Sequence, residues 1–170
     1  VPTWFLESKI GDNMLSKVNQ SNFWEITRSY RKRFPLEINF RSYYVDYFLK
    51  ALSGNNVYRE CQCYTVKTPL ARVDNVFEFA GKKILLEVKL NIALEEDLIS
   101  QLNQYIYAEY ICLSNDGNNN ITDFEKEFMF VIDVYSVYRY DVKVKKISKI
   151  FDLDEIKCKA DIITKIKQYS

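Results

Sequence analysis

The segment of residues 72–89 constrains the fold of this chain more than any other part of its sequence. It reads RVDNVFEFAGKKILLEVK, which is two apolar, strand-like stretches on either side of a Gly-containing turn at Ala80–Gly81. Asp74 lies six residues before Ala80 and Glu87 six residues after Gly81, so a turn there sets the two acids opposite each other. Opposed residues of an antiparallel pair point to the same face, with Cβ atoms ~4.5–5.5 Å apart. The pattern predicts a β-hairpin that carries two carboxylates side by side.

A lysine joins these acids on the same face of the hairpin. Glu87 and Lys89 are two residues apart in a strand, and their side chains are therefore separated by about 6.6 Å. The opposite face of this strand is an apolar stripe made of Ile84, Leu86, Val88 and Leu90. Two carboxylates ~4 Å apart repel by about 1 kcal/mol in water and about 4 kcal/mol at an effective dielectric constant near 20. Lys89 offsets part of this repulsion, and a divalent cation would offset the rest; the alternative is a solvated strand with an ordinary Glu–Lys pair.

A helix expected at about 94–112 adds polar groups to the same region. Its apolar stripe consists of Leu94, Leu98, Leu102 and Tyr105, with Gln101 beside it. Gln101 and Tyr105 are four residues apart and share one face of the helix. A buried amide without a partner costs ~1–3 kcal/mol, so Gln101 needs one. A helix that packs back on the sheet can aim both side chains at the acids; the alternative is a helix-edge glutamine and a core tyrosine.

The combination of Asp74, Glu87-Val-Lys89 and Gln101-Leu-Asn-Gln-Tyr105 resembles the core of the PD-(D/E)XK nuclease superfamily. The QxxxY helix is similar to the branch that includes RecB-type nucleases and the nuclease domains of type I restriction subunits. The resemblance covers roughly residues 40–140. It implies an α/β fold with a restriction-endonuclease-like α-β-β-β-α-β core, in which a mixed central sheet is flanked by helices. It also implies metal-dependent hydrolysis of phosphodiester bonds, most readily in DNA, in a restriction, phage-defence or repair context.

The chain departs from the family pattern at two points. Val73 precedes Asp74 where the family name has proline, and the chain has no histidine, which the RecB branch often places upstream. An acid on the first core helix is the usual substitute, and Asp46, in the helix expected at 41–53, lies where one is expected.

The resemblance assigns a role to each matched residue. Asp74 and Glu87 would ligate Mg²⁺, or Mn²⁺ in its place, together with the backbone carbonyl of Val88 and with Asp46 through water. Lys89 would orient the attacking water and stabilise charge on the phosphoryl oxygens. The remaining two matched residues, Gln101 and Tyr105, would position that lysine or the nucleic-acid backbone. An inactive nuclease-fold module for binding or assembly, and an unrelated α/β protein, are the alternatives.

The charge of the chain is local rather than global. The net charge of +1 lacks the basicity typical of nucleic-acid-binding domains. A basic cluster near the N-terminus, accompanied by Trp24 and Tyr30, consists of Arg28, Arg31, Lys32 and Arg33. It is a candidate for tracking a phosphate backbone, with a solvated helix face as the alternative. Weak binding by one such chain favours a partner, in a homodimer or a larger nuclease or helicase assembly.

The remaining composition indicates one packed domain of 170 residues. We expect a helical extension at 1–39, a core at 40–140 and a C-terminal strand and helix at 141–170. Strands are expected at 57–66 and 128–134, a hairpin or edge strand at 136–140 and a closing helix at 154–169. The four cysteines form no CxxC motif, so reduced, mostly buried thiols are expected rather than zinc. No apolar run reaches the ~20 residues of a membrane span and no signal peptide is evident, which favours a cytoplasmic location.

Overall fold

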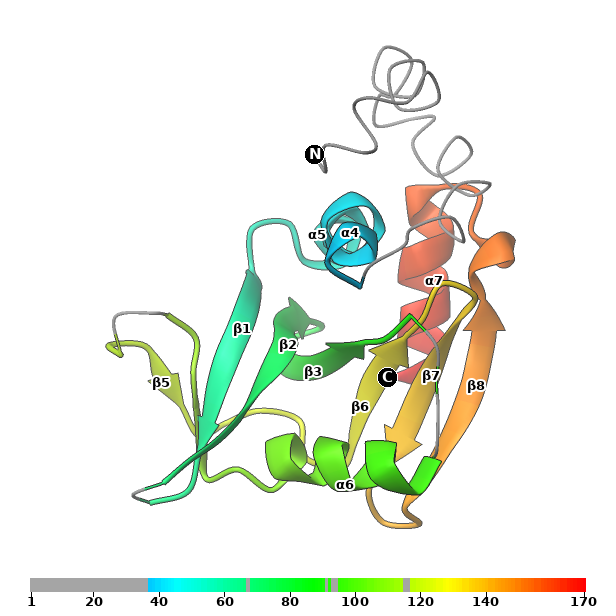
Figure 1. Cartoon of the computed structure of the whole chain (residues 1–170). Coiled ribbons are helices and arrows are strands. Elements are labelled where there is room, and N and C mark those ends of the chain that lie inside the picture. The colour runs from blue at the N-terminus through cyan, green and yellow to red at the C-terminus, as the bar shows by residue number, and fades with distance from the viewer. Residues whose placement is uncertain (1–36, 67, 91, 93–94, 115–116) are drawn as a thin grey trace.

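The computed structural model describes residues 37–170, except 67, 91, 93–94 and 115–116 (Figure 1). The expected N-terminal helical region therefore lies almost wholly outside the described residues. The same is true of the basic cluster of Arg28, Arg31, Lys32 and Arg33, and of Leu94 at the start of the predicted helical stripe.

The described residues form one mixed sheet of eight strands, in the order β5-β4-β1-β2-β3-β6-β7-β8. The strands are β1 (Val57–Tyr64), β2 (Pro69–Phe79), β3 (Lys82–Val88), β4 (Tyr110–Cys112), β5 (Asn120–Ile121), β6 (Phe128–Ile132), β7 (Ser136–Asp141) and β8 (Lys146–Asp152). All neighbouring strands are antiparallel except β3 and β6, which are parallel. A parallel pair needs a long crossover connection, and the chain between β3 and β6 contains a helix. The expected α/β class with a mixed sheet is confirmed.

Helices cover both faces of this sheet (Figure 1). On one face, α4 (Glu37–Phe40), the π-helical segment η2 (Arg41–Val45) and α5 (Asp46–Ser53) follow one another along the chain and pack near α7 (Lys159–Tyr169). Their apolar side chains share a core with Ile84, Leu86 and Val88 of β3, the stripe that alternation predicted. On the other face, α6 (Glu95–Ile106) packs on Leu85 and its neighbours. The face with Glu87 is thus the α6 face.

The hairpin of β2 and β3 has the predicted register. Its paired positions run from Phe79–Lys82 at the turn to Asn75–Leu86. The two turn residues, Ala80 and Gly81, have φ values of +52° and +77°. Positive φ at both central residues is the geometry of a type I′ turn, whose twist matches that of the flanking strands. Ala-Gly is an unusual dipeptide for this turn because alanine has a Cβ that disfavours the left-handed conformation.

The prediction of a helix up to residue 112 was wrong at its C-terminal end. The N–H groups of Tyr107 and Ala108 still donate to helical carbonyls, but the N–H of Glu109 donates to the carbonyl of Tyr64 at 2.9 Å. From there the chain continues as β4, which pairs with β1. The ring of Tyr110 stacks on that of Tyr64 with centroids 4.9 Å apart, a contact between positions far apart in sequence. Cys112 is therefore a strand residue, and not the last residue of a helix.

The C-terminal region also differs in detail from the expectation. The predicted hairpin or edge strand at 136–140 is β7, which lies inside the sheet because β8 pairs with its outer side. The closing helix begins at Lys159 and not at 154, since the chain first forms a short 3₁₀ turn, η3 (Leu153–Glu155). β8 lies within 141–170, where a C-terminal strand was expected.

The cysteines are free thiols, as expected, and three of the four are buried. Burial raises the pKa values of the Cys61 and Cys63 thiols to about 12, so both stay protonated at neutral pH. Within the part of the chain that the structure describes, no helix has the length and apolar character needed to cross a membrane.

Candidate active site

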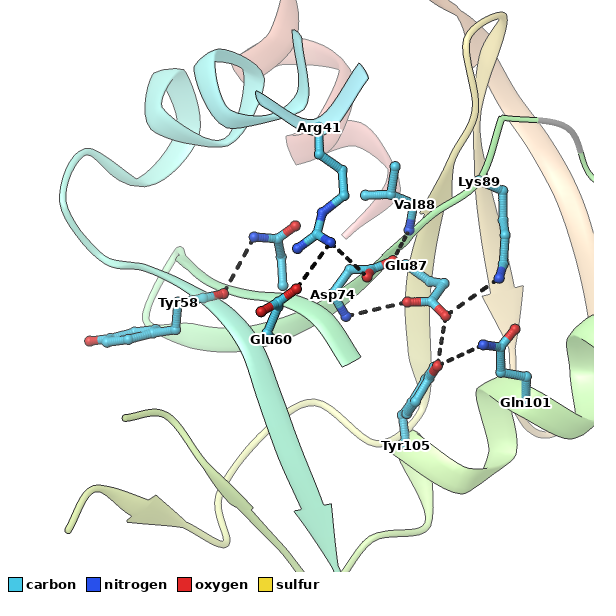
Figure 2. Close-up of polar contacts among 10 residues, drawn as sticks. Arg41, Tyr58, Glu60, Asp74, Glu87, Val88, Lys89, Gln101 and Tyr105 are labelled. Atoms are coloured by element: carbon cyan, nitrogen blue, oxygen red, sulfur yellow. Dashed lines mark hydrogen bonds and ion pairs between the residues drawn. The ribbon is translucent and has the colours of Figure 1, made fainter. Parts of the chain in front are cut away.

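The structure brings five of the predicted residues into one network of polar contacts (Figure 2). Asp74 comes from β2, Glu87 from the end of β3, and Lys89 directly follows that strand. The other two members, Gln101 and Tyr105, come from α6. The two strands of one hairpin and the helix that follows them therefore contribute to one site.

Where the regular pairing of β2 and β3 ends, the carboxylates of Asp74 and Glu87 accept hydrogen bonds from main-chain N–H groups. Beyond the Asn75–Leu86 pair, the N–H of Asp74 donates to Glu87 Oε1 at 3.3 Å. The N–H of Val88 donates to Asp74 Oδ2 at 2.7 Å. Each carboxylate thus satisfies a main-chain donor of the other strand, which fixes both side chains against the sheet. The residues that the register predicted to face each other are in contact through these bonds.

The α6 side of the network consists of a tyrosine and a glutamine in series. The hydroxyl of Tyr105 donates to Glu87 Oε2 at 2.7 Å, and Gln101 Nε2 donates to the same hydroxyl oxygen at 2.9 Å. Lys89 Nζ lies 3.9 Å from Glu87 Oε2. Gln101 is only partly buried, and its hydrogen-bond partner is Tyr105. Both α6 residues act on Glu87 in this structure, and neither has a hydrogen bond to Lys89 among the contacts of the described residues.

Burial controls the charge of Glu87, whose side chain is only 3% exposed. Its pKa is raised to about 9, first by desolvation and then by the hydrogen bond and the negative charge of Asp74. The hydroxyl of Tyr105 and the ammonium of Lys89 lower this pKa but do not compensate. Burial and the neighbouring carboxylate likewise raise the pKa of Tyr105 above its usual range. At neutral pH and without a cation, the Glu87 carboxyl therefore holds a proton.

Two residues of the helix on the opposite face also act on this site, and the sequence analysis missed both. Arg41 Nη1 lies 3.5 Å from Asp74 Oδ1 and 3.5 Å from Glu60 Oε1 (Figure 2). The pKa of half-buried Glu37 is raised, first by burial and then by the charge of Asp74, while Lys89 and Arg41 lower it. Glu37 and Arg41 are four residues apart, so a helix that begins at residue 37 places them on one face. The helix was expected to begin at residue 41, and this spacing was therefore not considered.

Asp46, the acid proposed from the first core helix, lies in a different environment. It forms an ion pair with Arg59 of β1, and both residues line a cavity of about 390 Å³ next to Tyr47 and Lys50. The structure shows no contact between Asp46 and the carboxylates of Asp74 or Glu87 among the described residues. The structure therefore does not bring Asp46 into the network.

The donor set determines which ligand the site can hold. Among residues 37–170, with the gaps noted above, no three His, Cys, Asp or Glu side chains lie together in a way that could bind a metal ion. A cation here would rest on two carboxylates, Asp74 and Glu87, with main-chain oxygen and water completing its shell. Mg²⁺ prefers such hard oxygen ligands and usually keeps several waters. Because Glu87 is buried next to Asp74, a divalent cation between the two carboxylates would offset their mutual repulsion, and in this respect the pair fits such a cation.

No protein-family model, no curated protein and no solved structure matches this chain. The chemistry of the site is therefore the basis for a function. Adjacent carboxylates, a partly exposed lysine and a partly buried arginine can together hold a cation and an anionic substrate, because they offer oxygen ligands beside donors of positive charge.

Proposed function

We propose that this protein is a metal-dependent nuclease that hydrolyses phosphodiester bonds, with DNA as the favoured substrate. The observation that carries the proposal is the Asp74–Glu87 pair with Lys89 beside it, held from behind by Tyr105. The order of elements supports a PD-(D/E)XK-type core. A helical region at 37–53 precedes three antiparallel strands and then α6; after two short strands, β4 and β5, β6 runs parallel to β3.

Each residue of the site would have a distinct role in this reaction. Asp74 and Glu87 would hold Mg²⁺ or Mn²⁺ with the carbonyl of Val88, and the chemistry supplied by the bound cation would be a water of lowered pKa and a polarised phosphate. Tyr105 keeps Glu87 oriented through its 2.7 Å hydrogen bond, and Gln101 fixes the tyrosine hydroxyl. Lys89, whose side chain is 26% exposed, can reach solvent and stabilise charge that develops on the phosphoryl oxygens.

The test is cleavage of plasmid and oligonucleotide DNA with Mg²⁺ or Mn²⁺. We expect Lys89→Ala to abolish cleavage, because the Lys89 ammonium, which lies 3.9 Å from Glu87, would stabilise the charge that develops on the phosphoryl oxygens. Lys83→Ala is the matched control: Lys83 lies on β3, the strand that Lys89 directly follows, is 30% exposed and pairs with Glu78. Metal-dependent cleavage that persists in Lys89→Ala, or that falls equally in both variants, would contradict the assignment.

Metal binding tests the nuclease fold, and cleavage then separates an active enzyme from an inactive module of that fold. We expect Mn²⁺ to raise the melting temperature of the wild-type chain and to have no such effect on Asp74→Ala, which lacks one of the two carboxylates. A Mn²⁺-dependent shift without cleavage of any nucleic acid would favour a binding or assembly module. Absence of the shift in the wild-type chain would reject both nuclease-fold interpretations.

A further inference from the structure

Arg41 forms an ion pair with one of the two carboxylate oxygens of Asp74. Asp74 Oδ2 accepts the N–H of Val88, while Oδ1 faces the guanidinium of Arg41 at 3.5 Å. The same nitrogen of Arg41 lies 3.5 Å from Glu60. The Arg41 side chain is only 16% exposed, so this positive charge is held between two acids at the edge of the proposed metal site.

The backbone that carries Arg41 is unusual. Arg41 begins the π-helical segment η2, and the N–H of Asp46 donates to the carbonyl of Arg41, which is the i+5 bond of a π turn. Such turns are rare and occur frequently at functional sites, because the extra residue rotates the side chains that follow. Here Tyr43, Tyr44 and Val45 are buried in the core, while Arg41 faces the acids.

We propose that Arg41 is the counter-ion of Asp74 until a divalent cation binds, and that it then contacts a phosphate of the nucleic acid; this inference rests on the proposed nuclease function. A cation at Asp74 neutralises the carboxylate that holds the guanidinium and repels the guanidinium itself. Glu60 remains as its second partner and keeps it near the site. Planar guanidinium groups match phosphate oxygens in a bidentate manner, so the freed face of Arg41 suits the substrate.

A purely structural role for Arg41 makes the opposite prediction for metal affinity. If Arg41 only ties the helix to the hairpin, its loss releases Asp74 and weakens metal binding. If Arg41 competes with the cation, its loss strengthens metal binding, because the Coulomb repulsion between two nearby positive charges disappears. Arg41→Gln removes the charge and keeps a polar side chain that can still bond to the carboxylates.

The test uses the full chain and two readouts. We expect calorimetry to show Mn²⁺ binding roughly five- to tenfold tighter in Arg41→Gln than in the wild-type chain, from the lost repulsion. We expect anisotropy of a labelled DNA oligonucleotide, in a Lys89→Ala background saturated with Mn²⁺, to show binding roughly tenfold weaker when Arg41→Gln is added. Arg59→Gln is the control for Mn²⁺ affinity, since it removes a neighbouring positive charge that pairs with Asp46 instead.

The outcomes are distinguishable. Unchanged or weaker Mn²⁺ binding in Arg41→Gln overturns the inference while leaving the proposed function standing. A wild-type chain that does not bind Mn²⁺ overturns both. If Arg41→Gln does not fold, Arg41→Lys decides. It keeps the charge and loses the planar fork, so Mn²⁺ affinity within about twofold of wild type with weaker oligonucleotide binding supports the inference. Equal oligonucleotide affinity in Arg41→Lys overturns it.

Discussion

The buried carboxyl of Glu87 should make the stability of the fold depend on pH. Its pKa is about 9 in the folded chain against 4.5 for an unperturbed glutamate. Between these values the folded state binds a proton that the unfolded state releases, so the free energy of unfolding falls as pH rises. The slope for one proton is about 1.4 kcal/mol per pH unit. We expect Glu87→Gln, which mimics the protonated form, to remove this dependence.

The size of this change in unfolding free energy follows from the pH range in which only the folded state is protonated at Glu87. From pH 5 to pH 8 the wild-type chain should lose up to about 4 kcal/mol from this group, an upper limit because water can enter the site and stabilise the ionised carboxylate. The variant should match the wild-type chain near pH 5, where the carboxyl is neutral in the folded state. At pH 8 it should be the more stable of the two, by up to the same amount. A gain of stability on replacing an ionisable residue is unusual, and it identifies the cause as the burial that keeps Glu87 protonated in the folded state.

Urea unfolding followed by circular dichroism at several pH values measures this effect. Glu78→Gln is the matched control, because Glu78 lies in the same hairpin, is 32% exposed and pairs with Lys83. The control should keep the wild-type slope. Parallel curves for the wild-type chain and Glu87→Gln would refute the reasoning. If the proposed function holds, saturating Mn²⁺ should flatten the wild-type slope, since a bound cation displaces the proton, and should leave Glu87→Gln nearly unaffected.

Two further substitutions test the hydrogen bond of Tyr105 to Glu87 and the turn of the hairpin. Tyr105→Phe should cost about 1–3 kcal/mol of unfolding free energy at neutral pH and raise the pKa of Glu87 further, because the tyrosine hydroxyl lowers it. Because Tyr105→Phe raises this pKa, it should extend the fall of unfolding free energy to higher pH than in the wild-type chain. Tyr140→Phe, which removes a hydroxyl that donates to Asn103 of α6, should leave the upper pH limit of that fall unchanged; equal upper limits in the two variants would contradict this role of Tyr105. Ala80→Asn should raise the unfolding free energy by about 0.5–1 kcal/mol, because Asn-Gly tolerates positive φ at both turn positions. An unchanged or lower urea midpoint would contradict that account of the turn.

The hairpin and its polar face were predictable because they depend on local periodicity. Residues that alternate in a strand and lie equally far from a turn must share a face, which placed Asp74 against Glu87. The spacing of Gln101 and Tyr105 likewise followed from helical geometry, and so did their contact with each other. These predictions needed only the turn position and the helix period.

The parts that were missed depend on contacts between distant segments. The end of α6 is set by the pairing of Tyr110 with Tyr64, which no local pattern near residue 107 indicates. The contact of Arg41 with Asp74 depends on how the helix at 37–53 lies across the sheet, and on a π turn that shifts its side chains. Asp46 shares that helix but contacts Arg59 instead. Periodicity gives the faces of an element, whereas tertiary packing decides what each face meets.

Fold stability alone does not explain the pair of acids. Glu87 lies between Leu86 and Val88, both fully buried, where an apolar or amide side chain would avoid the desolvation that raises its pKa. The ammonium of Lys89 lowers the pKa of this carboxyl but does not offset burial and the charge of Asp74. Tyr105 and Gln101 nevertheless hold it in one orientation, and buried networks of this kind are costly unless every member is satisfied. Local rules are typically broken in this way at functional sites. A divalent cation is the ligand that would remove the cost, which is why the arrangement supports a metal-dependent reaction more than a structural role.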